Sequence, residues 1–270
     1  MEQAMNILQQ LSVNNDCYKA NVNKQDSRYT TFQRRGPIGA VLHSIGCPQP
    51  SAHVLANGWN VPNKPVAVHA VLQADGTVYQ CLPWNFRGWH VGGEANNTHI
   101  GVEMTEPDCI RYTGGSSFTC SDLARAREQV RGTYRTAVEL FAMLAKQYGW
   151  NPETDIMSHA EAHARGLGSN HGDPEHLWRG LGLPYTMDTF RADVAKKMKE
   201  TEETEMRYDK LADLKKDVWA NKYYLPTVEK LMGKGILNGK GGEGDNTILD
   251  LGEDAIRVLV ALDRAGVFGE

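Results

Sequence analysis

The sequence has no surplus of positive charge and no long apolar run. Its 270 residues contain 29 Lys and Arg against 33 Asp and Glu, which gives a net charge of -4 and an isoelectric point near 6.1. Binding of nucleic acid through a broad basic surface is therefore excluded, because such binding depends on excess Lys and Arg. No stretch reaches the ~18 consecutive apolar residues that a membrane-spanning helix needs, so no membrane span is expected.

Cysteine is scarce, and no export leader is expected. The five cysteines are irregularly spaced and form no C-x-x-C pair, which argues against a disulfide framework and against a thiolate zinc cluster. Residues 1–13 contain no Lys or Arg and mix Gln and Glu among the apolar positions, which is unlike a secretory signal peptide. We therefore expect synthesis and retention in the cytoplasm.

The length and composition of the chain suit one large domain or two unequal ones. Apolar residues make up 41% of the chain and charged residues 23%, which is enough to bury a core. Residues 39–45 and 67–72 are β-rich runs bounded by Gly and Pro, and Asp75-Gly76 separates the second run from TVYQCL. Asp-Gly between apolar runs is a strong hairpin signal. Residues 1–14 read as a short amphipathic helix.

Further along, short strands alternate with one long helical pattern. Residues 100–104 and 155–158 read as strands, and a Gly- and Ser-rich loop is expected at 114–117. Apolar residues recur at helical spacing from 123 to 148, and Gly149 ends that helix. Mixed strands covered by helices predict an α/β layer architecture.

The composition changes after residue 187. Residues 188–206 include KKMKETEETEM, which has almost nothing to bury and reads as a charged linker or helix. Residues 207–270 hold two apolar helical stretches, at 227–234 and 253–265. We therefore expect a catalytic or binding domain at 1–187, followed by a small, mainly helical domain at 207–270.

Histidines concentrate near the end of the first domain, together with carboxylates. The cluster comprises His159, Glu161, His163, His171, Asp173, Glu175 and His176. Catalytic zinc takes three protein ligands, typically imidazoles and a carboxylate, and keeps one position open. His159 directly follows a predicted strand, Asp173 follows a Gly-rich turn, and His43 lies at the end of another strand, so these three form the preferred ligand set.

Five sequence blocks occur in a characteristic order: VLHSIG, ADGTVYQ, RGWHVGG, NNTHIGVEM and SHAEAHARGLGSNHGDPEHLW. Together they resemble the zinc-dependent N-acetylmuramoyl-L-alanine amidases of the amidase-2 family, which are related to peptidoglycan recognition proteins. The resemblance covers roughly residues 20–185 and implies a mixed central sheet covered by helices. With the small trailing domain, the chain further resembles a bacteriophage endolysin, which reaches the wall through a membrane hole made by a companion protein.

The resemblance implies specific roles for residues of this chain. His43, His159 and Asp173 match the family's zinc ligands, and Glu103 matches a glutamate on the strand I-G-x-E. Zinc would supply a hydroxide nucleophile near neutral pH, Glu103 would carry the proton, and a donor near the ligands would stabilise the oxyanion. His171 stands at the donor position, where the family often has Lys.

Substrate contacts are expected around the aromatic segment PWNFRGWH. The resemblance places this segment at the substrate groove, and the residues expected to line the groove are Trp84, Asn85, His90 and Asn97. Aromatic residues this close together are more often core, and both interpretations stay open. His69 reads as a core histidine. In the second domain, Trp219, Tyr223 and Tyr224 are either glycan anchors or the aromatic core of a small fold.

The sequence therefore predicts a zinc-dependent hydrolase that cuts the amide between N-acetylmuramic acid and L-alanine. Its partners would be the glycan and stem peptide of peptidoglycan, and a wall ligand for residues 207–270. A non-catalytic peptidoglycan receptor on the same fold is the alternative, although such receptors typically lose ligands that this chain retains. A Cys-His wall peptidase is a third reading, but Cys47 and Cys109 lie outside any recognisable nucleophile motif.

Overall fold

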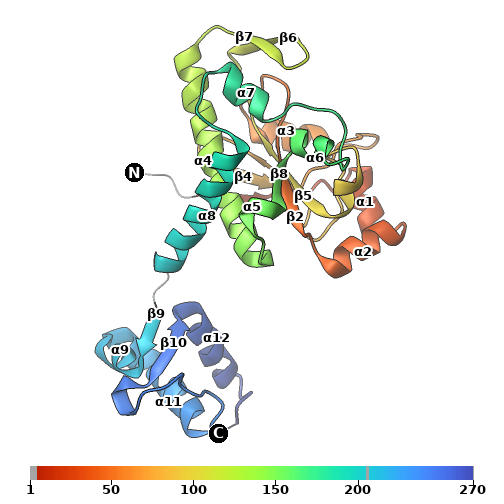
Figure 1. Cartoon of the computed structure of the whole chain (residues 1–270). Coiled ribbons are helices and arrows are strands. Elements are labelled where there is room, and N and C mark those ends of the chain that lie inside the picture. Colours follow the sequence, from red (N-terminus) through yellow and green to blue (C-terminus); the bar gives the residue numbers. More distant parts are fainter. Residues whose placement is uncertain (1–4, 205–206, 270) are drawn as a thin grey trace. The chain divides into compact units, whose positions relative to one another are not determined.

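The computed structural model describes residues 5–204 and 207–269. The chain divides into two compact units, Met1–Met198 and Lys199–Glu270. The first unit contains a central sheet with helices on both faces (Figure 1). Within the described residues, no helix combines the length and the apolarity needed to cross a bilayer.

The central sheet of the first unit is mixed, as predicted. Its strand order is β1-β4-β3-β5-β2-β8. Strand β4 runs antiparallel to β3, and the other neighbouring pairs are parallel. The strands are β1 (Asn6–Gln9), β2 (Gly39–Ser44), β3 (Ala70–Leu72), β4 (Thr77–Gln80), β5 (His99–Met104) and β8 (Ile156–Ser158). The hairpin expected at Asp75-Gly76 is the β3–β4 connection.

The helix predicted for residues 1–14 is wrong over its described part, and residues 1–4 lie outside the described residues. Strand β1 instead pairs in parallel with β4. Met5 and Ile7 pack against the main core while Leu8 points to solvent, which is the period-two alternation of an edge strand. Hydrogen bonding to the edge of β4 thus stabilises a strand more than the weak helical pattern of this short polar segment stabilises a helix.

Helices cover both faces of this sheet (Figure 1). The long helix α4 has the predicted extent, Leu123–Tyr148, with the Asp122 side chain capping its start and Gly149 in the left-handed conformation at its end. The other helices are α1 (Asp16–Val22), α2 (Ser27–Arg35), α3 (Ala52–Trp59), the 3₁₀ turn η1 (Glu94–Asn97), α5 (Pro152–Asp155), α6 (His159–Ala164), α7 (Glu175–Gly180) and α8 (Met187–Thr204).

The alternation of side chains along β2 and β5 places His43 and Glu103 on the same face of the sheet. On β2, Ala40 and Leu42 belong to the large core that also contains the buried face of α4. Val41 lies between them and packs with Met157 in a separate cluster on the opposite face. His43 shares the parity of Val41, and Glu103 is its register partner on β5. Both side chains therefore belong to the face opposite α4.

A hairpin replaces part of the loop expected around residues 114–117. Strands β6 (Ile110–Gly114) and β7 (Ser117–Cys120) pair antiparallel, with Tyr112 opposite Phe118. Gly114 and Gly115 both have positive φ at the tip, a conformation that glycine tolerates best. Phe118 packs so closely on α7 that a Cβ at Gly180 would lie 2.5 Å from its ring. Alternating side chains on both sides of Gly-Gly indicate a hairpin, but the Gly and Ser content of the segment favoured a loop instead.

The second unit has its own apolar core. Its elements are β9 (Arg207–Lys210), α9 (Leu211–Lys216), α10 (Val218–Tyr223), α11 (Leu225–Gly233), the 3₁₀ turn η2 (Gly244–Asn246), β10 (Ile248–Gly252) and α12 (Glu253–Arg264). Leu214, Val228 and Ile256 are fully buried in this core. The two predicted helices are confirmed as α11 and α12, and the antiparallel pair β9–β10 was not predicted. Helix α8 occupies most of the segment 188–206, of which residues 205–206 lie outside the described residues.

His69 is confirmed as a core histidine with both ring nitrogens bonded. Its Nε2 lies 2.7 Å from the carbonyl oxygen of Phe86, and its Nδ1 accepts from the amide of Gly101 at 3.0 Å. Complete burial lowers the pKa of His69 to about 4, with a smaller opposing effect from the bond to Phe86.

We expect His69 to make the fold acid-sensitive. Its pKa is lower in the folded than in the unfolded chain, so its stabilising contribution is complete above about pH 6.5 and is lost as the pH falls toward 4. The loss amounts to roughly 3 kcal/mol. The free energy of unfolding of wild type and His69→Gln should be measured in urea from pH 7 to 4. Parallel curves for the two proteins would show that His69 does not titrate this way.

Candidate metal centre

Three side chains from distant parts of the chain meet above the ends of the central parallel strands. His43 is near the carboxyl end of β2, and His159 is the first residue of α6, directly after β8. Because β2 pairs in parallel with β8, the carboxyl ends of both strands lie at the same edge of the sheet. Asp173 returns to this edge just before α7 and completes the set of ligands that was predicted.

The start of α6 fixes the direction of His159. Ser158 accepts a hydrogen bond from the amide of Glu161, and the Glu161 carboxylate accepts one from the amide of Ser158, which together form a capping box. Glu161 also pairs with Arg191 of α8 at 2.9 Å. This carboxylate is therefore engaged on the far side of α6, as expected from its position two residues after His159. His163 is exposed and is not part of the cluster.

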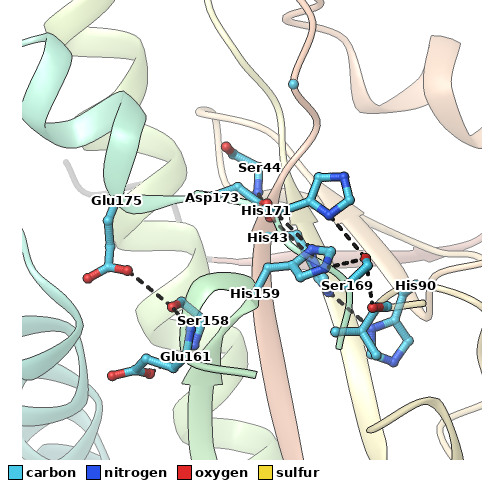
Figure 2. Close-up of polar contacts among 12 residues, drawn as sticks. His43, Ser44, His90, Ser158, His159, Glu161, Ser169, His171, Asp173 and Glu175 are labelled. Atoms are coloured by element: carbon cyan, nitrogen blue, oxygen red, sulfur yellow. Dashed lines mark hydrogen bonds and ion pairs between the residues drawn. The ribbon is translucent and has the colours of Figure 1, made fainter. Parts of the chain in front are cut away.

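Each pair of these side chains approaches to the spacing of ligand atoms around a tetrahedral ion, with Asp173 facing the two histidines through different oxygens. His43 Nδ1 lies 3.1 Å from His159 Nδ1 and 3.2 Å from Asp173 Oδ2, and His159 Nδ1 lies 3.4 Å from Asp173 Oδ1. A tetrahedral ion with bonds of about 2.0–2.1 Å separates its ligand atoms by roughly 3.3 Å. Figure 2 shows the three side chains pointing toward one another. The residues present therefore fit a divalent cation with one open position.

The electrostatics of the cluster favour an ionised Asp173 beside a neutral His43. Burial alone would raise the pKa of Asp173, but the adjacent imidazoles of His159 and His43 outweigh it and hold that pKa far below its usual range. Burial lowers the pKa of His43, and the bond to Asp173 only partly opposes this effect. These are the protonation states in which Asp and His bind metals.

Glu103 supplies a second carboxylate without a partner. It is buried and lines the same cavity, and its Oε2 finds no hydrogen-bond partner among the described residues. Burial raises the pKa of Glu103 well above its usual value, and the charges of Asp173 and Glu106 raise it further. A buried carboxyl group that favours its protonated form is suited to accept and return a proton.

His171 lies beside the ligands but is exposed to the cavity. Its ring centroid is 4.4 Å from that of His159, and its Nδ1 lies 3.1 Å from the hydroxyl of Ser169. The same hydroxyl lies 3.2 Å from His159 Nε2 (Figure 2). Ser169 therefore connects a ligand histidine with the predicted oxyanion donor, a link that the sequence did not predict.

The cluster opens into a cavity of about 830 Å³, within the range of small-molecule sites.

One wall of this cavity is formed by hydrogen-bonded side chains that the sequence did not reveal. Tyr112 of β6 donates its hydroxyl hydrogen to Glu106 at 2.8 Å, and the same hydroxyl lies 2.7 Å from His176 Nε2. Glu106 is fully buried and also accepts from the amide of Gly46. These hydrogen bonds hold Tyr112 at the cavity. The sequence could have indicated this only if the β6–β7 hairpin had been recognised.

The four predicted substrate contacts do not all lie at this cavity. His90 lines it, together with Trp89 of the same segment. Trp84 and Asn85 line a separate, smaller cavity beside β4 and the end of α4. Asn97 bonds to Arg87 at 2.6 Å and to Glu94. Only His90 is therefore brought together with the ligands, and the substrate contacts assigned to the other three residues stay predictions.

Known proteins are similar to much of this chain. Residues 33–176, more than half of the chain, match the sequence profile of the N-acetylmuramoyl-L-alanine amidases (Amidase_2). A comparison with curated proteins finds no significant match. Among solved structures, the hydrolase AmiA of Staphylococcus aureus is 19% identical with a TM-score of 0.50, over 63% of this chain and 78% of AmiA. A mutant endolysin from Bacillus subtilis is 18% identical with a TM-score of 0.46, over 70% of this chain and 99% of its own.

Removing one ligand should remove metal binding without unfolding the chain. We expect Zn²⁺ at about 100 times its dissociation constant to raise the melting temperature of the wild type by roughly 5–10 °C. His159→Ala and Asp173→Ala should show no rise, because two donors remain. His163→Ala is the matched control, since this exposed histidine lies outside the cluster, and it should behave as wild type. An equal rise in all four proteins would place the metal elsewhere.

Proposed function

We propose that this chain, which belongs to the N-acetylmuramoyl-L-alanine amidase family, works with a zinc ion held by His43, His159 and Asp173. The protein is a peptidoglycan amidase. The bond cut is the amide between N-acetylmuramic acid and L-alanine. The observation that carries this proposal is the cluster of His43, His159 and Asp173, whose ring nitrogens and carboxylate oxygens approach to 3.1–3.4 Å, next to the unpartnered Oε2 of Glu103.

Zinc suits this set of donors better than a harder cation does. Two imidazoles and one carboxylate are a common catalytic zinc set, whereas magnesium and calcium prefer sites made of oxygen atoms only. When bound, the ion polarises the scissile carbonyl and makes a water molecule acidic enough to act as a nucleophile near neutral pH. The remaining steps belong to side chains of this protein.

Glu103 is proposed to move the proton. Its unpartnered Oε2 takes the proton of the attacking water, and its raised pKa favours holding that proton until the amine of L-alanine leaves. The proton then passes to the amine nitrogen as the carbon–nitrogen bond breaks. His171 is proposed to donate to the oxyanion. The hydroxyl of Ser169, 3.1 Å from Nδ1 of this ring, holds the ring beside the cluster.

The biological setting is proposed to be lysis of a host cell wall. One catalytic unit joined to a small second unit is the arrangement expected of an endolysin, which acts on the wall after release from the cell. Peptidoglycan offers both halves of the substrate, the glycan and the stem peptide. A cavity of about 830 Å³ with the ligands at its wall accommodates one muramoyl residue and the first residues of a stem.

The second unit is proposed to bind the wall through α10. Trp219 and Tyr223 are 51% and 37% exposed, and their ring centroids lie 4.9 Å apart. Lys222 lies over the ring of Tyr223. Tyr224 is instead buried in the core and bonded to Glu253. Adjacent exposed rings beside a cation suit a saccharide with anionic groups.

Digestion of purified walls tests the catalytic proposal. We expect wild type to release free stem peptides that begin with L-alanine, identified by mass spectrometry, and a chelator to stop the release. Glu103→Gln should retain bound zinc but lose about 10²–10⁴-fold in kcat, because the proton carrier is gone.

Metal content and product identity separate the alternatives. A non-catalytic receptor would bind walls and release no peptide from them. A thiol peptidase would keep its activity after chelation and release peptides cut within the stem. Zinc-loaded Glu103→Gln with wild-type activity would remove this residue from the chemistry.

A wall-sedimentation assay on the full chain tests the role of α10. Trp219→Ala should reduce the bound fraction severalfold, because an exposed stacking platform is lost. Val258→Ala is the matched control, since Val258 is a 59% exposed apolar residue on α12. Trp219→Phe keeps an aromatic face and should bind nearly as wild type. Equal sedimentation of all these proteins would contradict a role for α10.

A further inference from the structure

The second ring nitrogen of His43 has a specific partner. Nε2 of His43 lies 3.0 Å from Nδ1 of His90, and the two rings meet edge to face with centroids 5.2 Å apart. Nε2 of His90 in turn lies 3.2 Å from the carbonyl oxygen of His99. A chain of two imidazoles thus runs from the metal centre to a backbone carbonyl on β5.

The carbonyl at the end of this chain fixes the hydrogen positions along it. A carbonyl oxygen only accepts, so Nε2 of His90 must carry hydrogen to bond with His99. Neutral His90 then has a lone pair on Nδ1, which can bond to His43 only if Nε2 of His43 carries hydrogen. Neutral His43 consequently presents an unprotonated Nδ1, and this is the atom that faces His159 and Asp173. The result is the tautomer that a metal needs.

From this geometry we infer that His90 is a positioning residue that holds the ligand His43 in its metal-binding tautomer and orientation. This role rests on the proposed metal centre and deepens it. His90 touches neither the ion nor the scissile bond in this role, so its effect is exerted through His43. The RGWHVGG block then serves the metal centre in addition to any contact with substrate.

The fold holds the His90 ring in place for this task. The amides of His90 and Val91 both donate to the side chain of Asn96, at 2.8 and 3.0 Å. The ring lies against Gly101, where a Cβ would come within 2.2 Å of its Cγ. Only glycine leaves room for the ring at this point of β5, because real Cβ atoms do not approach a neighbour so closely. The position of His90 is therefore set by the Asn96 side chain and by the backbone of Gly101.

The second ligand histidine has a parallel support from the same segment. Nε2 of His159 lies 3.2 Å from the hydroxyl of Ser169, which donates to the carbonyl oxygen of Val91 at 3.1 Å. With that hydrogen directed to Val91, the hydroxyl oxygen accepts from His159 Nε2, and Nδ1 of His159 again remains free for the metal. Consecutive residues, His90 and Val91, thereby support both ligand histidines.

A matched pair of substitutions tests the role of His90. His90→Asn places an oxygen acceptor close to the position of Nδ1, whereas His90→Leu has the same branching without an acceptor. We expect His90→Leu to weaken zinc binding about 10–100-fold, measured by competition with a chromophoric chelator, and His90→Asn to stay within about threefold of wild type. His53→Leu, on an exposed helical histidine, is the control for loss of a histidine and should bind as wild type.

The outcomes distinguish this role from the existence of the metal centre. Wild-type affinity in His90→Leu, or an equal loss in both His90 variants whose metal-free melting temperatures match wild type, overturns the role of His90 while leaving the centre intact. A wild-type protein that binds no zinc overturns the centre, and the role of His90 with it.

A measurement on the unaltered protein covers the case in which His90→Leu does not fold. Long-range ¹H–¹⁵N spectra of the zinc-loaded wild type report the tautomer of each histidine. We expect His90 to carry its hydrogen on Nε2, with Nδ1 as an acceptor. Hydrogen on Nδ1 of His90, or on both nitrogens, would contradict the inference.

Discussion

Three electron-rich side chains are held within about 3.4 Å of one another in a buried place, and the rest of the first unit serves this constraint. Two imidazoles and one carboxylate in such close contact favour a divalent cation between them. Parallel pairing of β2 with β5 and β8 brings the strand ends together, and the capping box at Ser158 sets the entry of α6. The large core under the opposite face, against α4, stabilises the strands that position the cluster.

Much of the cluster could be predicted from the sequence because two of its side chains lie where strands end. The β2 and β8 runs are short, apolar and bounded by clear signals, so His43 and His159 were placed correctly beside one another. Asp173 was found through the resemblance and the Gly-rich turn before it. Helix α4 was also predicted with the correct extent, since 26 residues of consistent periodicity and a terminal glycine leave little ambiguity.

The errors have a common physical cause, which is that side-chain patterns carry little information about sheet edges and about hairpins that lack an Asp-Gly turn. Strand β1 exists because β4 offers a free edge, a fact that appears nowhere in residues 5–10. The β6–β7 hairpin was hidden by its Gly and Ser content, and with it the chain from Tyr112 through Glu106 that forms a wall of the cavity. A sequence motif also does not show which of its residues reach the cavity. Trp84 and His90 lie six residues apart, yet only His90 reaches the ligands.

X-ray absorption at the zinc edge of the loaded protein tests the central claim most directly, because it reports the atoms around the ion regardless of activity. Two imidazoles and one carboxylate predict a first shell of nitrogen and oxygen only, at about 2.0–2.1 Å, with the outer scattering typical of two histidine rings. A zinc–sulfur distance of about 2.3 Å, or a shell without histidine scattering, would contradict the assignment of His43, His159 and Asp173 as the metal ligands.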